Sequence, residues 1–120
     1  MQARARAEWW FSLLALLPAL AIGCVYAEAF LASRSLGHWP TPSIEDPKNL
    51  PTAPLHVVSA ILVLSVLPGA VVFAAVSVKN WRVLRKPSAY WVWVAALALS
   101  LSLYLWAGHV DPRTWEWWWD

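Results

Sequence analysis

Residues 57–78 read VVSAILVLSVLPGAVVFAAVSV, a stretch of 22 residues without Asp, Glu, Lys or Arg. As a helix with a rise of about 1.5 Å per residue, this stretch crosses the roughly 30 Å hydrocarbon core of a bilayer. Its side chains do not alternate between apolar and polar, as they do in the strands of a membrane β-barrel. A helix is the remaining spanning structure, because it satisfies every backbone N–H and C=O within the segment. The stretch therefore predicts a transmembrane helix.

Two further stretches share this property. Residues 9–27 carry no charge between Glu8 and Glu28, and residues 90–107 form a third apolar body. We therefore expect an all-α membrane protein with one membrane domain over residues 1–120. The predicted parts are transmembrane helices at 9–30, 56–78 and 89–109, an outer loop at 31–55, an inner loop at 79–88 and an outer tail at 110–120.

The composition excludes several other classes of protein. The chain is 60% hydrophobic and 13% charged, whereas soluble domains have about 25% charged residues. A chain of this size leaves too much surface to hide the excess apolar side chains in a core. A soluble enzyme, a disulfide-stapled secreted domain and a disordered segment are therefore excluded. A net charge of +2 is too small for a nucleic-acid partner, so the expected surroundings are the lipid bilayer and another membrane protein.

The positions of Lys and Arg predict the orientation. The N-terminal segment and the 79–88 connection hold six of the nine basic residues and one of the seven acidic ones. Basic segments stay on the cytoplasmic side, so the N-terminus is expected inside and the C-terminus outside, in a bacterial cytoplasmic (inner) membrane. Tryptophan flanks both predicted interfaces, at Trp9, Trp10, Trp81, Trp91 and Trp93 on the inner side and at Trp39, Trp106, Trp115 and Trp117 to Trp119 on the outer side.

The C-terminal tail is too short for a fourth span. Pro112 is expected to end the third helix, and eight residues follow it. Four of these eight are tryptophans. We expect them to lie along the outer interface or to insert into a partner.

Small residues predict where the helices meet. Small side chains let membrane helices approach closely. In the first span they follow a four-residue spacing, and shorter sets occur in the other two spans. The expected packing residues are Ala15, Ala19, Gly23 and Ala27 in the first span, Ser65 and Gly69 in the second, and Ala96 and Ser100 in the third. Pro18 and Pro68 are expected to kink their helices, and facing kinks would open a cavity for a ligand.

The ionisable groups nearest the outer interface are the candidate contacts for a ligand or partner. These are Glu28, His38, His56, His109 and Asp111, together with Trp39. Imidazole and carboxylate groups suit zinc or copper, but no local histidine spacing presets a site, so no metal or cofactor is predicted. A structural contact of Glu28 with Arg34 or His56 is the alternative. No ionisable residue lies near the centre of a span, which argues against an ion-coupled exporter.

The outer loop contains five prolines, which favour a stiff, extended path. Such a loop serves either as a docking surface or as a short crossing of the outer face. Its pattern is carried by Gly37, Trp39, Pro40, Pro42, Asp46, Pro47 and Lys48. It resembles the G-x-W-P-x-P…D-P-K loop of small, uncharacterised bacterial membrane proteins. The resemblance implies a bacterial membrane setting and no activity.

The single cysteine leaves one alternative open. Ala21-Ile22-Gly23-Cys24 resembles the lipobox at which bacterial lipoproteins are cut and lipidated. Processing there would remove the first span. Without a second cysteine to pair with, Cys24 is otherwise expected to be a small buried residue.

Three functional hypotheses follow. The first is a non-catalytic accessory or scaffold subunit, or a homo-oligomer, that acts through helix packing and its outer loop. The second is a small binding or transport unit for an apolar molecule such as a lipid or quinone, using the proline kinks and the outer histidines. A membrane enzyme is the third, and it lacks support because the chain has no Ser-His-Asp set and no Gly-rich phosphate loop.

Overall fold

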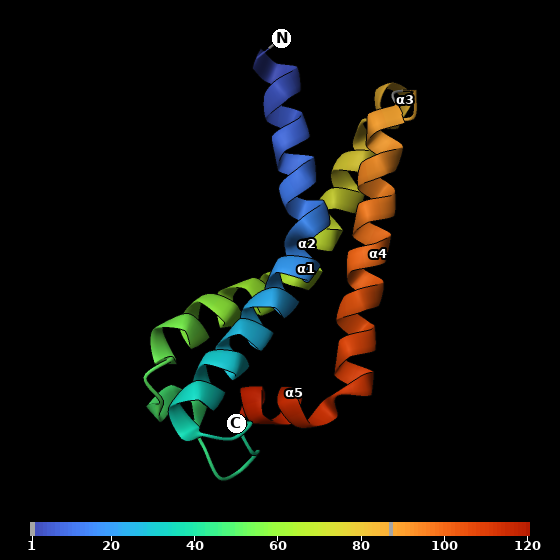
Figure 1. The fold of residues 1–120 in the computed structure, drawn as a ribbon. Coiled ribbons are helices and arrows are strands. Elements are labelled where there is room, and N and C mark those ends of the chain that lie inside the picture. The colour runs from blue at the N-terminus through green and yellow to red at the C-terminus, as the bar shows by residue number, and fades with distance from the viewer. Residues whose placement is uncertain (1, 87) are drawn as a thin grey trace.

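Three long helices dominate the computed structural model, which describes residues 2–86 and 88–120. They are α1 (Gln2–Leu36), α2 (Ala53–Lys79) and α4 (Ser88–Val110), and they run along the 53 Å axis of the molecule (Figure 1). Three short helices complete the chain: η1 (Pro47–Asn49), α3 (Trp81–Leu84) and α5 (Pro112–Trp119). Residues 37–52 and α5 lie at one end of the bundle, which we call the loop end, and α3 lies at the opposite end (Figure 1).

Each long helix contains a segment that is long and apolar enough to cross a membrane. These segments are Trp9–Leu36, Ala53–Lys79 and Tyr90–Val110. The prediction of three spanning helices is confirmed in this sense, and the chain has the make-up of a multi-pass membrane protein. The first helix is longer than predicted, because it continues through residues 31–36, which were assigned to the loop. It ends at Gly37, whose φ of 78° is the left-handed conformation that closes many helices.

Helix α1 packs against both α2 and α4. The predicted small-residue stripe forms only part of this contact: Ala15 is buried and Ala19 half-buried, but Gly23 and Ala27 are exposed. The reason is geometric, because a four-residue spacing advances roughly 40° around the helix at each step. The buried face instead follows two neighbouring rows whose steps alternate between four and three residues: Pro18, Ile22, Val25, Ala29 and Ala32, and Ala21, Val25, Glu28 and Ala32. The packing expected at Gly23 and Ala27 therefore does not occur within the monomer.

Small residues of the other helices do meet α1. A Cβ on Gly69 of α2 would lie 2.8 Å from the Leu17 side chain, so α2 approaches α1 closely there. The Ser100 hydroxyl of α4 donates to the Ala15 carbonyl at 2.6 Å. Ala96 packs against the aromatic cluster of Phe11, Phe73 and Tyr90, whereas the Ser65 hydroxyl bonds within α2, to the Ile61 carbonyl at 2.6 Å.

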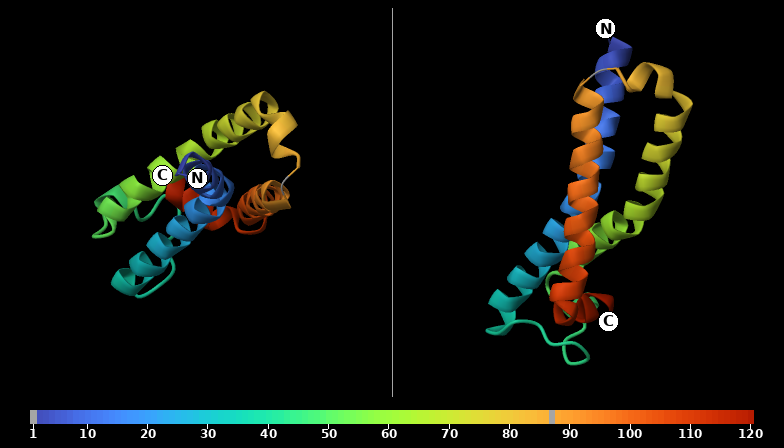
Figure 2. Two further views of the ribbon diagram at one scale, coloured as in Figure 1. Left: turned by 90° about the horizontal axis from the view of Figure 1, so that it is seen from above. Right: turned by 90° about the vertical axis from the view of Figure 1, so that its right-hand side faces the viewer.

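Both prolines lie inside their helices. Helices α1 and α2 each contain one, Pro18 and Pro68 respectively, and both change direction along their length (Figure 2). A proline removes one helical hydrogen bond and favours such a bend. Pro18 is buried and Pro68 is exposed, and it is Gly69 that meets α1.

The C-terminal tail forms a short helix, α5. Pro112 ends α4 and starts α5, since a proline is favoured in the first turn of a helix. The Asp111 side chain caps this turn by accepting a hydrogen bond from the Thr114 amide at 3.3 Å. Trp115, Trp117 and Trp118 are buried against α1, α2 and α4. These three side chains therefore pack into the chain's own bundle, and the position of the tail at the outer interface stays a prediction.

Candidate functional site

A buried carboxylate joins three helices at the loop end. Glu28 lies on the α1 face that meets α2, and its side chain is fully buried. His56 Nδ1 lies 2.8 Å from one carboxylate oxygen. Ser59 Oγ and Trp118 Nε1 lie 2.8 and 3.0 Å from the other. Helix α2 supplies His56 and Ser59, and α5 supplies Trp118, so the carboxylate connects α1, α2 and α5.

The surroundings of Glu28 match what a buried carboxylate needs. Burying an acidic group in a membrane segment costs free energy unless hydrogen-bond donors surround it. The hydroxyl and indole groups are donors here, and Trp118 Nε1 also lies 2.9 Å from Ser59 Oγ. The His56 and Trp118 rings pack with their centroids 5.1 Å apart. The Glu28 carboxylate is therefore hydrogen-bonded to residues of α2 and α5, and these bonds hold α5 against the bundle.

A second polar network lies beside the first, around Asp111. Tyr26 and Thr114 donate their hydroxyls to Asp111 Oδ2 at 3.1 and 2.7 Å. The indole of Trp39 donates to the Thr114 hydroxyl at 3.0 Å. Burial by itself would raise the pKa of Asp111, but the hydrogen bonds from Thr114 and Tyr26 and the charge of Arg113 lower it below its ordinary value. Asp111 therefore connects α1 to α5, and Thr114 extends this network to the loop through Trp39.

The last residue of the tail holds the proline-rich loop. The Ser43 amide donates to the Asp120 carboxylate, and Lys48 Nζ lies 2.6 Å from the Asp120 backbone oxygen. Arg113 reaches the Thr41 hydroxyl at 3.5 Å. Within the loop, the Thr41 amide donates to Glu45 at 2.7 Å. The contacts of Asp120 and Arg113 join residues more than seventy positions apart in sequence, so the loop and tail form one surface.

The three histidines do not come together. His38 Nε2 lies 3.3 Å from Glu45 in the loop, and His56 contacts Glu28. His109 is exposed near the end of α4. Within the described residues, no three His, Cys, Asp or Glu side chains gather as metal ligands would. The expected Glu28–His56 contact is present.

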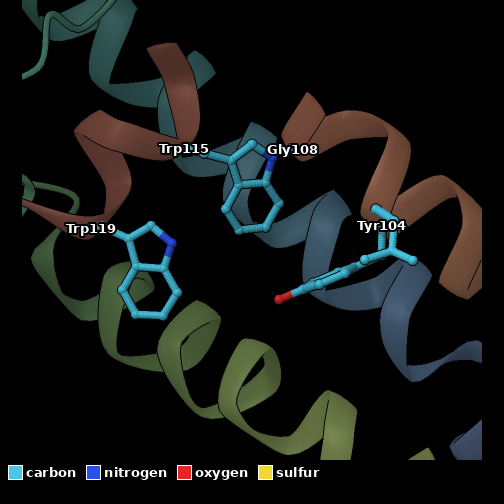
Figure 3. A pocket seen from close by; sticks show the side chains of 5 residues that line it. Tyr104, Gly108, Trp115 and Trp119 are labelled. Atoms are coloured by element: carbon cyan, nitrogen blue, oxygen red, sulfur yellow. The ribbon is translucent and has the colours of Figure 1, made fainter. Parts of the chain in front are cut away.

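An aromatic pocket of about 300 Å³ lies between α4 and α5. It is lined by Tyr104, Leu105, Gly108, Trp115 and Trp119. Figure 3 shows the Tyr104 ring and the two indoles around the same space, with the Tyr104 hydroxyl directed between the indoles. The Tyr104 and Trp115 rings meet edge to face, with centroids 5.5 Å apart.

One of the residues missed by the sequence analysis carried a weak signal. Ser59 follows His56 by three positions, which places both on one helix face and would have added it to the Glu28 site. Trp118 and Thr114 carried no such local signal, because their partners lie far away along the chain. No known protein family, curated protein or solved structure matches this chain.

Proposed function

We propose that this chain is a non-catalytic subunit of a bacterial cytoplasmic membrane, with its loop end outside the cell. In this proposal the loop end holds a membrane-protein partner or a second copy of the chain. The observation that supports the proposal is the set of hydrogen bonds between the loop and the tail, made by Asp120, Arg113 and Trp39. A surface ordered before binding loses less conformational entropy when a partner docks.

The polar groups at the loop end support a structural role. Glu28 and Asp111 are engaged by donors from their own chain. The arrangement uses its charges to fix α5 and the loop in place. The expected activity is therefore recognition and not chemistry on a substrate.

Exposed apolar side chains on this ordered surface supply the proposed contacts. Ile44 is 75% exposed, and Trp119 and Trp39 are 60% and 41% exposed. Ile44 follows Ser43, whose φ of 63° is unusual for a residue other than glycine and whose amide is held by Asp120. Large apolar side chains near the centre of an interface often dominate its affinity.

The test is native mass spectrometry on protein extracted gently from its own membrane. We expect the wild-type chain in a complex with a protein partner or with itself. Ile44→Ala is expected to weaken that complex about tenfold, which corresponds to roughly 1.4 kcal/mol. Val78→Ala is the matched control, because Val78 is 77% exposed but lies at the opposite end of α2.

Two results would contradict the proposal. One is a wild-type chain that is recovered only as a monomer, without a protein partner. The other is a complex that Ile44→Ala and Val78→Ala leave equally intact.

A further inference from the structure

The turn between α2 and α3 forms a basic pocket of about 370 Å³. One continuous segment of the chain lines it: Val78, Lys79, Asn80, Trp81 and Arg82. Lys79 and Arg82 are its charged members, and both are exposed. No acidic residue occurs in the sequence between Asp46 and Asp111, and neither cation forms an ion pair within the part of the chain that the structure describes. The pocket therefore presents two positive charges to a ligand.

The turn that carries these two cations is held in place by aromatic packing. Trp81 lies between them in the sequence, and its ring packs edge to face against Tyr90 and Trp91 of α4. The ring centroids are 6.4 and 5.9 Å apart. This packing fixes the backbone between Lys79 and Arg82, so less conformational entropy is lost when a ligand binds there.

An apolar groove of about 280 Å³ lies between α1 and α2. Its lining is apolar and aromatic: Trp10, Phe11, Leu14, Val72 and Val76. Trp10 is 67% and Val72 49% exposed, and both belong to segments that are apolar enough to cross a membrane, so the groove opens toward lipid. Its volume is just below the range of small-molecule sites. The groove therefore covers part of one acyl chain, with the remainder of a lipid outside.

Helix α2 places the groove and the basic pocket next to each other. Val72, Val76 and Lys79 are spaced by four and then three residues, which puts them on one face of the helix. Val76 lines the groove and Lys79 lines the pocket, and they are separated by a rise of about 4.5 Å along the helix axis. The pocket and the groove therefore follow each other along α2, with the cations at the α3 turn and the apolar lining toward the middle of the helix.

This order of charge and apolar surface matches the shape of a phospholipid. The phosphate of a phospholipid lies at the membrane surface, and its acyl chains extend from there toward the bilayer centre. Basic side chains at the end of a transmembrane helix attract anionic lipids, and basic pockets between such helices bind their headgroups. The N-terminus of α1 lies at the same end as α3 (Figure 1), and the segments at this end hold six basic residues and one acidic residue. This excess of positive charge favours an anionic over a zwitterionic headgroup.

We propose that Lys79 and Arg82 bind the phosphate of an anionic diacyl phospholipid, one acyl chain of which lies in the groove between α1 and α2. In the proposed orientation the α3 end lies in the cytoplasmic leaflet, but the lipid site does not depend on that orientation. It also does not depend on the loop-end partner, because Ile44, Trp39 and Trp119 line neither the pocket nor the groove.

The test is native mass spectrometry of the full chain in detergent micelles with added lipid. Dioleoyl phosphatidylglycerol and dioleoyl phosphatidylcholine carry the same acyl chains and differ in headgroup charge. We expect the first phosphatidylglycerol to bind at least about fivefold more tightly, which is the effect of one basic residue near an anionic headgroup. Inorganic phosphate at the same concentration is expected not to displace it. Equal affinity for the two lipids, or displacement by inorganic phosphate, would overturn the proposal.

Two charge variants locate the site of the headgroup. Lys79→Gln/Arg82→Gln is expected to weaken phosphatidylglycerol binding about 25-fold, at roughly fivefold for each charge. Arg85→Gln/Lys86→Gln is the matched control, because it removes two charges from the same end but neither residue lines the pocket. It is expected to keep the affinity within about threefold, since more distant charges are screened. Equal weakening by these two variants would overturn the proposal.

A charge-conserving variant separates binding from folding. Lys79→Arg/Arg82→Lys keeps both positive charges, so it is expected to keep the preference for phosphatidylglycerol over phosphatidylcholine. All variants are compared at equal helix content by far-ultraviolet circular dichroism. Loss of the preference in this variant at unchanged helix content would contradict a site that depends on charge.

Two further variants test the position of the acyl chain. Val72→Trp fills the groove and is expected to weaken phosphatidylglycerol binding several-fold through lost van der Waals contact. Val71→Trp is the matched control, because Val71 is 67% exposed and does not line the groove. Equal affinity of the two variants for phosphatidylglycerol would overturn the placement of the acyl chain.

The lipid site and the loop-end surface are tested separately. Lys79→Gln/Arg82→Gln is expected to leave the loop-end protein complex intact, and Ile44→Ala is expected to keep phosphatidylglycerol binding. Val78→Ala, the control for the loop end, keeps both cations of the pocket. A wild-type chain that shows no preference for phosphatidylglycerol would therefore overturn the lipid site alone.

Discussion

The hydrogen bond from Trp118 to Glu28 is expected to stabilise the fold measurably. Trp118→Phe removes an indole N–H that lies 3.0 Å from a buried carboxylate and keeps an aromatic ring against His56. Trp117→Phe makes the same chemical change at a neighbouring buried position, where the N–H has no partner within the described residues. The two variants remove the same atoms, so their difference reports on the surroundings of the two indole N–H groups, with Glu28 and Ser59 beside that of Trp118.

The expected difference follows from the two environments. A hydrogen bond to a charged group contributes about 1.5–3 kcal/mol to stability. Both Trp117 and Trp118 are almost fully buried, so the cavity left by the smaller ring is similar in the two variants. Trp117→Phe also removes a buried donor without a partner, which offsets part of its cavity cost. We therefore expect Trp118→Phe to lower the free energy of unfolding by about 1.5–3 kcal/mol more than Trp117→Phe does.

The assay is reversible unfolding in mixed micelles, titrated with sodium dodecyl sulfate and followed by far-ultraviolet circular dichroism. The signal reports helix content, so it does not depend on the fluorescence of the eleven tryptophans. Free energies of unfolding that agree within about 0.5 kcal/mol for the two variants would refute the reasoning. Glu28 would then not hold α5 through Trp118.

Three further predictions concern the helix contact, the tail and the loop. Gly69→Ala is expected to destabilise the protein by about 1–2 kcal/mol relative to Gly23→Ala in the same titration. The reason is that a Cβ at position 69 would lie 2.8 Å from a leucine of α1, whereas one at position 23 meets nothing within 4 Å. The pKa of Asp111 is lowered from 3.8 in the folded state, so its contribution to stability is full above that pH and is lost as the pH falls through the folded pKa. An Asp111→Asn variant should lose this part of the acid dependence, and an unchanged profile would contradict the assignment. Asp120→Ala should speed hydrogen exchange at the Ser43 amide, which donates to that carboxylate, and equal exchange rates would show that the tail does not hold the loop.

The long helices were predictable because a membrane imposes a simple length and charge requirement. The stretches without Asp, Glu, Lys or Arg locate α1, α2 and α4. The end of α1 was missed because Arg34 and Ser35 are polar, yet the helix continues until Gly37 closes it. Polarity marks where a helix leaves the apolar region, and the closing glycine marks where the helix itself ends.

The tail and most of the Glu28 site were not predictable in the same way. Pro112 ends the third helix as predicted, but a proline also favours the first turn of a new helix, and α5 was not predicted. The tail's tryptophans fit an interface or a core equally well by composition. The small-residue stripe of α1 was chosen by a four-residue spacing, which turns around the helix and leaves Gly23 exposed. The Glu28–His56 contact was one of two predicted alternatives, the other being Glu28–Arg34, and it forms between residues at the same ends of adjacent spans.

The placement of α5 against Glu28 supports the whole account of the loop end, and one measurement tests it directly. Nuclear Overhauser contacts of the Trp118 indole proton can be recorded on the wild-type chain in nanodiscs. The structure predicts contacts to protons of Ser59 and His56 and slow exchange of this indole proton with water, because Trp118 is 2% exposed. A Trp118 indole that exchanges as fast as that of Trp119, which is 60% exposed, and shows no contact to α2 would contradict the account.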